Sequence, residues 1–157
     1  MKSSTKKSLL AAFSLSAALI SFSSCSSSND DPSEHEELSN YKITVTLDNV
    51  NAADDYVAVV AVGTTYGAKT DVWKVNGVVR TGESSISLGD TDFTGATKTY
   101  VLETTEPIRL FNGGAEIVNY KEDLGVHYKI EKNGKVIINE NEVLKGDGSK
   151  FTKNYSF

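Results

Sequence analysis

From residue 41 onward, apolar and polar residues alternate along the chain. In the segment YKITVTLD at 41–48, every second residue is apolar and the residues between are polar. Successive side chains of a β-strand point to opposite faces of a sheet, so this pattern predicts a half-buried strand. The run DYVAVVAVG at 55–63 is rich in β-branched residues and is suited to the centre of a sheet.

Further short β-rich segments follow, and turn residues separate them. The segments are SSISL, KTYVLETT, PIRLF, AEIVNYK and KFTKNYSF, with GDTDFTGAT, Glu106-Pro107 and NGGA as the breaks between them. Frequent turn residues between short strands are typical of an all-β fold. No stretch after residue 40 has the 3.6-residue period of a helix.

Two Asn-Gly pairs predict tight hairpins. Asn76-Gly77 and Asn133-Gly134 each lie between two β-rich runs. Asn-Gly tolerates the positive φ angles of a type I′ turn, so each pair predicts a two-residue connection. In the second hairpin this register would place Lys132 opposite Lys135, a mildly unfavourable pair that a wider loop would avoid. The same register would place Tyr128, Ile130 and Ile137 on one face.

These elements predict a single all-β domain over residues 41–157. The expected architecture is an antiparallel β-sandwich of about 7–9 strands, with immunoglobulin-like and transthyretin-like topologies as the two alternatives. A domain of this size can bury a normal core without disulfides, which the chain cannot form internally because it has one cysteine. We expect this domain to be a soluble monomer.

The first residues have the pattern of a targeting signal. MKSSTKK is basic, and the apolar run at 9–20 is shorter than the roughly 20 residues of a membrane-spanning helix, so residues 1–24 are predicted to be a signal peptide. The segment FSSC that ends at Cys25 resembles the lipobox of bacterial lipoproteins, although Phe22 stands where that family prefers an aliphatic residue. The resemblance implies that Cys25 becomes the mature N-terminus and carries a diacylglycerol thioether and an N-acyl chain such as palmitate. The alternative is an ordinary secretory signal with a cysteine near its cleavage site.

The segment after Cys25 is expected to be a flexible acidic tether over residues 25–40. It contains five acids and one aliphatic residue, so it cannot bury enough apolar surface to offset its ordering entropy. Its Ser/Asp-rich start resembles the export signal that sends lipoproteins of some Gram-negative bacteria to the cell surface. We therefore expect a lipid-anchored protein of the outer membrane that faces the cell surface, with the periplasmic face as the alternative.

Charge and chemistry exclude several classes of function. Residues 41–157 carry 13 basic and 16 acidic side chains, so the basic patch of a nucleic-acid binder is absent. The two histidines, His35 in the tether and His127 in a strand, form no zinc-binding cluster. No nucleophile elbow or phosphate-binding glycine loop is present. We therefore expect a protein that is not an enzyme and has no cofactor.

Two acids are candidate calcium ligands. Asp90 and Asp92 belong to the loop GDTDFTG, and LDNVNAADD and KGDGS are also rich in oxygen ligands. Calcium takes about six to eight oxygens, but Asp, Asn and Gly also dominate ordinary turns, and none of these runs has EF-hand spacing. We expect these residues to form turns and not a metal site.

Trp73 and Arg80 are the candidate ligand-binding pair. They are predicted to lie opposite each other in the first hairpin, on the face of Val75 and Val78. An exposed tryptophan could stack on a sugar ring. The alternative, which we favour, is that Trp73 fills the core and Arg80 reaches the rim of the sheet.

The resulting hypothesis is a lipid-anchored binding or interaction module of the cell envelope. The membrane is its partner through Cys25, and the further partner is an envelope protein or a glycan. One alternative is a structural accessory lipoprotein of an envelope or secretion machine. The other is a surface adhesin that binds a glycan or calcium.

Overall fold

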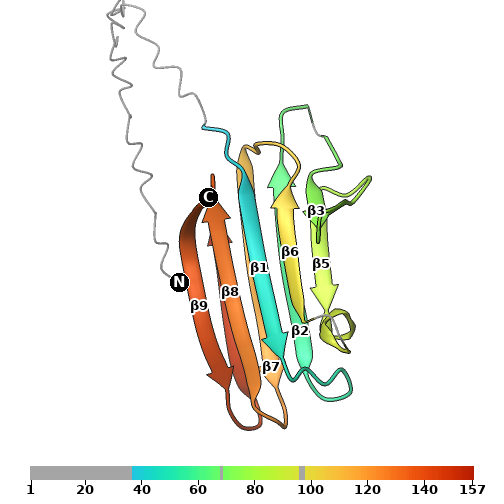
Figure 1. Cartoon of the computed structure of the whole chain (residues 1–157), viewed down its shortest axis with the longest axis vertical. Helices are drawn as coiled ribbons and strands as arrows, with labels where there is room; N and C mark the ends of the chain where they lie inside the picture. The colour runs from blue at the N-terminus through green and yellow to red at the C-terminus, as the bar shows by residue number, and fades with distance from the viewer. Residues whose placement is uncertain (1–36, 68, 96–97) are drawn as a thin grey trace, which may run out of the picture. The chain divides into compact units, whose positions relative to one another are not determined.

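Two antiparallel β-sheets face each other in the computed structural model, which describes residues 37–67, 69–95 and 98–157 (Figure 1). The six-stranded sheet has the order β4 (Val78–Val79), β3 (Trp73–Val75), β6 (Thr99–Thr104), β1 (Tyr41–Asp48), β8 (Leu124–Lys132) and β9 (Lys135–Leu144). The four-stranded sheet has the order β10 (Ser149–Ser156), β7 (Leu110–Asn119), β2 (Tyr56–Thr64) and β5 (Ser85–Gly89). The predicted antiparallel β-sandwich is confirmed, with ten strands instead of seven to nine.

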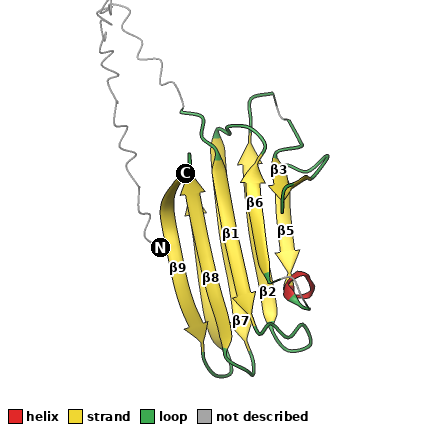
Figure 2. Ribbon diagram, viewed as in Figure 1, coloured by secondary structure: helices red, strands yellow, loops and turns green. Residues whose placement is uncertain are grey.

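The only helical element among the described residues is a short 3-10 helix, η1 (Asp90–Phe93), which follows β5 (Figure 2). Its one buried side chain, Phe93, packs edge-on against the ring of Tyr100 with the ring centres 5.0 Å apart. No helix in the described ranges is long and apolar enough to cross a membrane.

Aromatic side chains from both sheets meet in the core. Tyr41 of β1 stacks on Phe111 of β7 with 4.4 Å between ring centres, and Trp73 of β3 packs against the same Phe111 at 6.3 Å. Near the other side of the sandwich, Tyr128 of β8 meets Phe151 of β10 at 6.1 Å. Each contact joins one sheet to the other, so burial of these rings stabilises the sandwich as a whole.

The glycines of NGGA continue a strand and do not end one. PIRLF and AEIVNYK were expected as separate strands, but β7 runs without a break from Leu110 to Asn119. A Cβ atom at Gly113 would lie 2.6 Å from the ring of Phe111, and one at Gly114 would lie 2.7 Å from the carbonyl oxygen of Lys153. The glycines are therefore explained by close packing on the two faces of the strand, and the predicted break is wrong.

Both Asn-Gly turns have the predicted positive φ angles. The φ values are 49° at Asn76 and 80° at Gly77, and 50° and 77° at Asn133 and Gly134. The second turn keeps two residues although Lys132 lies opposite Lys135.

A bulge follows the second turn and changes the predicted register. It places Ile138, and not Ile137, opposite Ile130, and both Ile137 and Ile138 pack against the core. The turn is held from outside the hairpin, because the N–H of Asn133 donates to the carbonyl of Asn40 and the N–H of Asn40 donates to the side chain of Asn133, both at 2.8 Å.

The folded domain begins before residue 41. Ser39 is 1% exposed and exchanges two backbone hydrogen bonds with Ile108, at 3.0 and 2.9 Å. The boundary of the predicted tether at residue 40 is therefore too late, because these two residues before β1 are held by the fold.

Charged side chains line the seam where the edge strands β9 and β10 meet. The Tyr155 hydroxyl donates to Glu140 at 3.1 Å, and the ammonium of Lys153 lies 3.7 Å from Glu140 and 3.9 Å from Glu142. Burial, together with Glu140, raises the pKa of Tyr155 to about 12. Inward-pointing charges on edge strands discourage pairing with further strands, so the edge strands β9 and β10 are protected from such pairing at this seam.

Candidate functional site

A groove of about 370 Å³ crosses the outer face of the four-stranded sheet. Its floor is formed by Ala58, Val60 and Val62 of β2 together with Gly114 of β7. Its rim is formed by Asn112 and Glu116 of β7 and by Thr152 and Asn154 of β10. We call this feature the outer groove.

The floor follows from the composition of β2, which is apolar on both faces. Alternate residues of this strand, such as Val59 and Ala61, are buried in the core, so Ala58, Val60 and Val62 point outward. Val60 is 40% exposed and pairs with Gly114, which adds no side chain above the sheet. Strands that are apolar on both faces are usually covered on both, and no described residue of this chain is seen to cover this one.

The rim carries hydrogen-bonding groups that the protein itself does not use. The Ser156 hydroxyl donates to the Asn112 side-chain oxygen. By contrast, the side chains of Glu116, Thr152 and Asn154 have no hydrogen bond or ion pair with any described residue. The outer groove therefore combines an apolar floor with free amide, hydroxyl and carboxylate groups.

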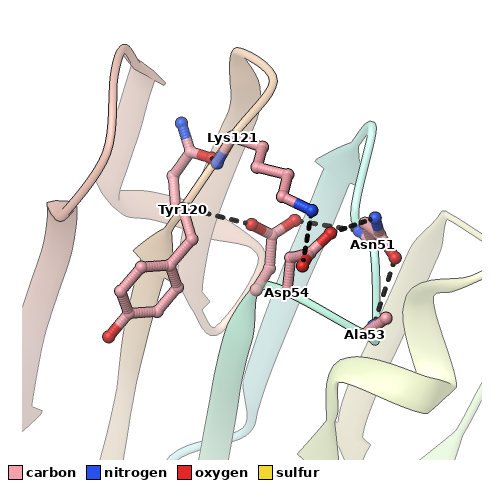
Figure 3. Close-up of polar contacts among 7 residues, drawn as sticks. Asn51, Ala53, Asp54, Tyr120 and Lys121 are labelled. Atoms are coloured by element: carbon pink, nitrogen blue, oxygen red, sulfur yellow. Dashed lines mark hydrogen bonds and ion pairs between the residues drawn. The ribbon is translucent and has the colours of Figure 1, made fainter.

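A second polar cluster lies at one end of the sandwich, between the β1–β2 loop and the β7–β8 loop (Figure 3). The Asn51 side-chain amide donates to Asp54 at 2.7 Å, and the N–H of Ala53 donates to the Asn51 side-chain oxygen at 3.1 Å. Lys121 crosses from the other loop and places its ammonium 2.8 Å from the second oxygen of Asp54. This hydrogen bond raises the pKa of Lys121.

Asp55 completes this cluster from a buried position. One of its carboxylate oxygens accepts the N–H of Asn51 at 2.9 Å, and the other accepts the N–H of Tyr120 at 3.1 Å. All four carboxylate oxygens of Asp54 and Asp55 thus face a donor of the protein. A calcium ion at these oxygens would therefore compete with the Lys121 ammonium and with backbone N–H groups. Within the described ranges, no three His, Cys, Asp or Glu side chains gather as a metal site.

The candidate calcium ligands Asp90 and Asp92 lie in η1 and have local partners. Asp92 accepts the N–H of Gly89 and Asp90 accepts the N–H of Thr91, both at 2.8 Å. These bonds satisfy donors at the start of the helix, which is the turn role expected from the sequence.

Trp73 and Arg80 lie opposite each other in the first hairpin, as predicted, because the N–H of Arg80 donates to the carbonyl of Trp73 at 2.8 Å. Trp73 is 0% exposed, and its indole N–H donates to the carbonyl of Ser84 at 3.0 Å. The core position expected for Trp73 is confirmed, and its ring has no face open to a ligand. Arg80 lies at the rim, as expected, 3.4 Å from Glu83, so the pair does not form the candidate ligand-binding site.

The remaining candidates lie in β8 or outside the described residues. His127 is half-buried in β8, and its Nε2 lies 3.1 Å from the side-chain oxygen of Asn139. Cys25 and His35 lie outside the described residues, as do the predicted signal peptide and most of the tether. The outer groove was not identified from the sequence, although the uninterrupted apolar run of β2 was the signal for it.

No protein-family model and no curated protein matches the sequence. Solved structures with the same fold include a protein from Parabacteroides distasonis, studied by NMR in its calcium-bound form. It is 20% identical, with a TM-score of 0.58 over 80% of this chain and 98% of its own. A DUF4425 family protein from Bacteroides ovatus is 13% identical, with a TM-score of 0.56 over 77% of this chain and 95% of its own. A DUF4425 domain of unknown function from Bacteroides vulgatus is 14% identical, with a TM-score of 0.56 over 76% and 94%. At these identities the similarity shows the fold alone.

Proposed function

We propose that the protein is a lipid-anchored interaction module of the bacterial cell envelope and that the outer groove is its contact surface. The anchor is Cys25, from the resemblance of its flanking residues to a lipobox. The groove supports a binding role because ligand sites are concave and mostly apolar, with a few polar groups that fix orientation. The module is proposed to act by binding and not by catalysis.

The single observation that carries this proposal is the uncovered apolar floor of the groove. β2 places Ala58, Val60 and Val62 on a face that its neighbours β5 and β7 do not cover. Contiguous exposed apolar surface rimmed by polar residues is typical of interaction sites.

Site-specific photocrosslinking in intact cells tests the proposal. A photoreactive amino acid at position 60 should give a crosslinked adduct with an envelope component. The matched control is position 143, because Val143 is also exposed (57%), lies in β9 and faces a glycine, Gly125, as Val60 faces Gly114. Adducts from position 143 and not from position 60, or from neither, would contradict the assignment of the groove as the contact surface.

Calcium binding is the second candidate, and the calcium-bound form of the Parabacteroides distasonis protein favours it. In this chain the ion would have to compete with the Lys121 ammonium for Asp54 and with two backbone N–H groups for Asp55. The polar cluster already contains a cation, the ammonium of Lys121. We therefore expect calcium to contribute little.

Thermal unfolding at millimolar calcium tests this expectation. The melting temperature should change little on addition of calcium and on its removal with a chelator. A rise of many degrees that is lost in Asp54→Asn/Asp55→Asn would establish calcium binding at the polar cluster. The same loss in Asp90→Asn/Asp92→Asn would place the ion at η1 instead.

A further inference from the structure

We propose that the outer groove binds a neutral oligosaccharide, an inference that rests on the groove being the contact surface and names its ligand. Three features support this ligand: the charge of the groove, the chemistry of its rim, and the exposed ring of Tyr56 on the same face of β2.

The outer groove is nearly free of charge. Glu116 is the one charged side chain on its rim. Lys153 also lines the groove, but its ammonium lies beside Glu140 and Glu142 in the seam between β9 and β10. Among the residues that line the groove, an anionic ligand would find no free cation and a cationic ligand would find a single carboxylate, so the electrostatics favour a neutral ligand.

The polar groups on the rim match sugar hydroxyls. The amides of Asn112 and Asn154 and the hydroxyl of Thr152 can each donate and accept, as a sugar hydroxyl does, and the Glu116 carboxylate accepts. Beside them, on β2, the methyl groups of Val60 and Val62 form a strip suited to the apolar C–H face of a sugar ring. A purely apolar partner, such as the face of another sheet, would leave these rim groups buried without hydrogen bonds, which is unfavourable.

The size of the groove suits a short chain of sugars. It crosses β2, β7 and β10, and neighbouring strands lie roughly 4.8 Å apart, so its polar rim on β10 is about 10 Å from its apolar floor on β2. Tyr56 lies two residues before Ala58 and so points to the same side of the sheet, where it is 50% exposed. Its ring can stack on a further sugar beyond the end of the groove.

Calorimetric titration of the full lipidated chain tests the inference. The protein is kept in a detergent without a sugar headgroup, because a glycoside detergent would compete for the groove. The probes are cellohexaose, maltohexaose, mannohexaose and chitohexaose, with the hexamer of galacturonic acid as the anionic comparison. We expect saturable binding of at least one neutral hexasaccharide and none of the galacturonate.

Substitutions test whether the oligosaccharide binds in the outer groove. Val60→Lys should weaken it at least about tenfold by placing an ammonium on the apolar floor, and Asn154→Ala and Tyr56→Ala should weaken it by smaller factors. Val143→Lys, at the matched position on β9, should leave it unchanged. If Val60→Lys does not fold, as judged by its melting temperature, the two surface variants Asn154→Ala and Tyr56→Ala still test whether the oligosaccharide binds in the groove.

The outcomes separate this inference from the proposed function. Binding of no neutral hexasaccharide, binding of the galacturonate alone, or binding unaffected by the groove variants would overturn the glycan inference. An envelope protein crosslinked at position 60 together with no glycan binding would overturn it while the groove remained the contact surface. No adduct and no binding would overturn both.

Discussion

Of two adjacent glycines in β7, one allows close packing of the core and the other lies in the proposed site. Gly113 faces the core, where a Cβ would also lie 3.1 Å from Ile43. Gly114 faces the outer groove and lets β10 approach closely, since a Cβ there would meet the backbone of Lys153. Neither glycine has a positive φ angle, so both are explained by space and not by backbone conformation.

Gly113→Ala should therefore destabilise the domain. The added methyl group would overlap the ring of Phe111 in a closely packed core, and we expect the free energy of unfolding to fall by about 1–3 kcal/mol. Denaturation in urea, followed by the fluorescence of the buried Trp73, measures this change.

The matched control is Gly89→Ala. Gly89 also lies in a strand, but an added Cβ would be 3.9 Å from its nearest neighbour, the carbonyl oxygen of Val57. Its effect should stay within about 0.5 kcal/mol. Equal effects of the two substitutions would show that loss of glycine, and not overlap with Phe111, governs stability at these positions.

At the scale of elements, the segment before β1 joins parts of the domain that are far apart in the sequence. Ser39 pairs with Ile108, just before β7, and Asn40 pairs with Asn133 in the turn between β8 and β9. Four hydrogen bonds of 3.0 Å or shorter therefore depend on these two residues, which lie outside any named strand. The segment ties the turn of the six-stranded sheet to the start of β7 in the other sheet.

Removal of this segment should lower stability. A chain that begins at Tyr41 should unfold at lower urea than one that begins at Glu37. Its free energy of unfolding should be lower by about 2–6 kcal/mol, since each of the four lost hydrogen bonds contributes roughly 0.5–1.5 kcal/mol. Both chains should keep the β-sheet circular dichroism spectrum. Equal midpoints for the two chains would show that Ser39 and Asn40 are not held in solution as they are here.

At the scale of the whole molecule, the proposed function depends on an anchor that lies outside the described residues. Cys25→Ser should abolish lipid attachment and release the protein from membranes into the soluble fraction. The physical reason is that lipid chains contribute about 0.8 kcal/mol for each buried CH₂, and the mature chain has no other long apolar segment.

Fractionation after a high-salt wash measures this release. A serine variant that stays with the outer membrane would show that the anchor lies elsewhere. The membrane face is tested separately, because protease added to intact cells should cut the segment at 26–36 if the protein is on the surface. Complete protection would favour the periplasmic face.

The sequence by itself determined the class of fold and most strand positions. Alternation with period two is a local property of a strand that buries one face, so YKITVTLD coincides with β1 and both Asn-Gly turns are where they were predicted. The core position of Trp73 also follows from its neighbours in the sequence, because a short apolar hairpin must bury one face.

Only the tertiary structure decided which residues are opposed across the fold. The continuity of β7 through two glycines, the bulge after Ile130 and the inclusion of Ser39 in the domain depend on contacts with distant strands. The outer groove depends on them as well, because its floor and rim come from three strands that are neighbours in space and separated in the sequence. A pattern of apolar residues shows that a face is apolar, but it takes the packed sheets to show that this face stays uncovered.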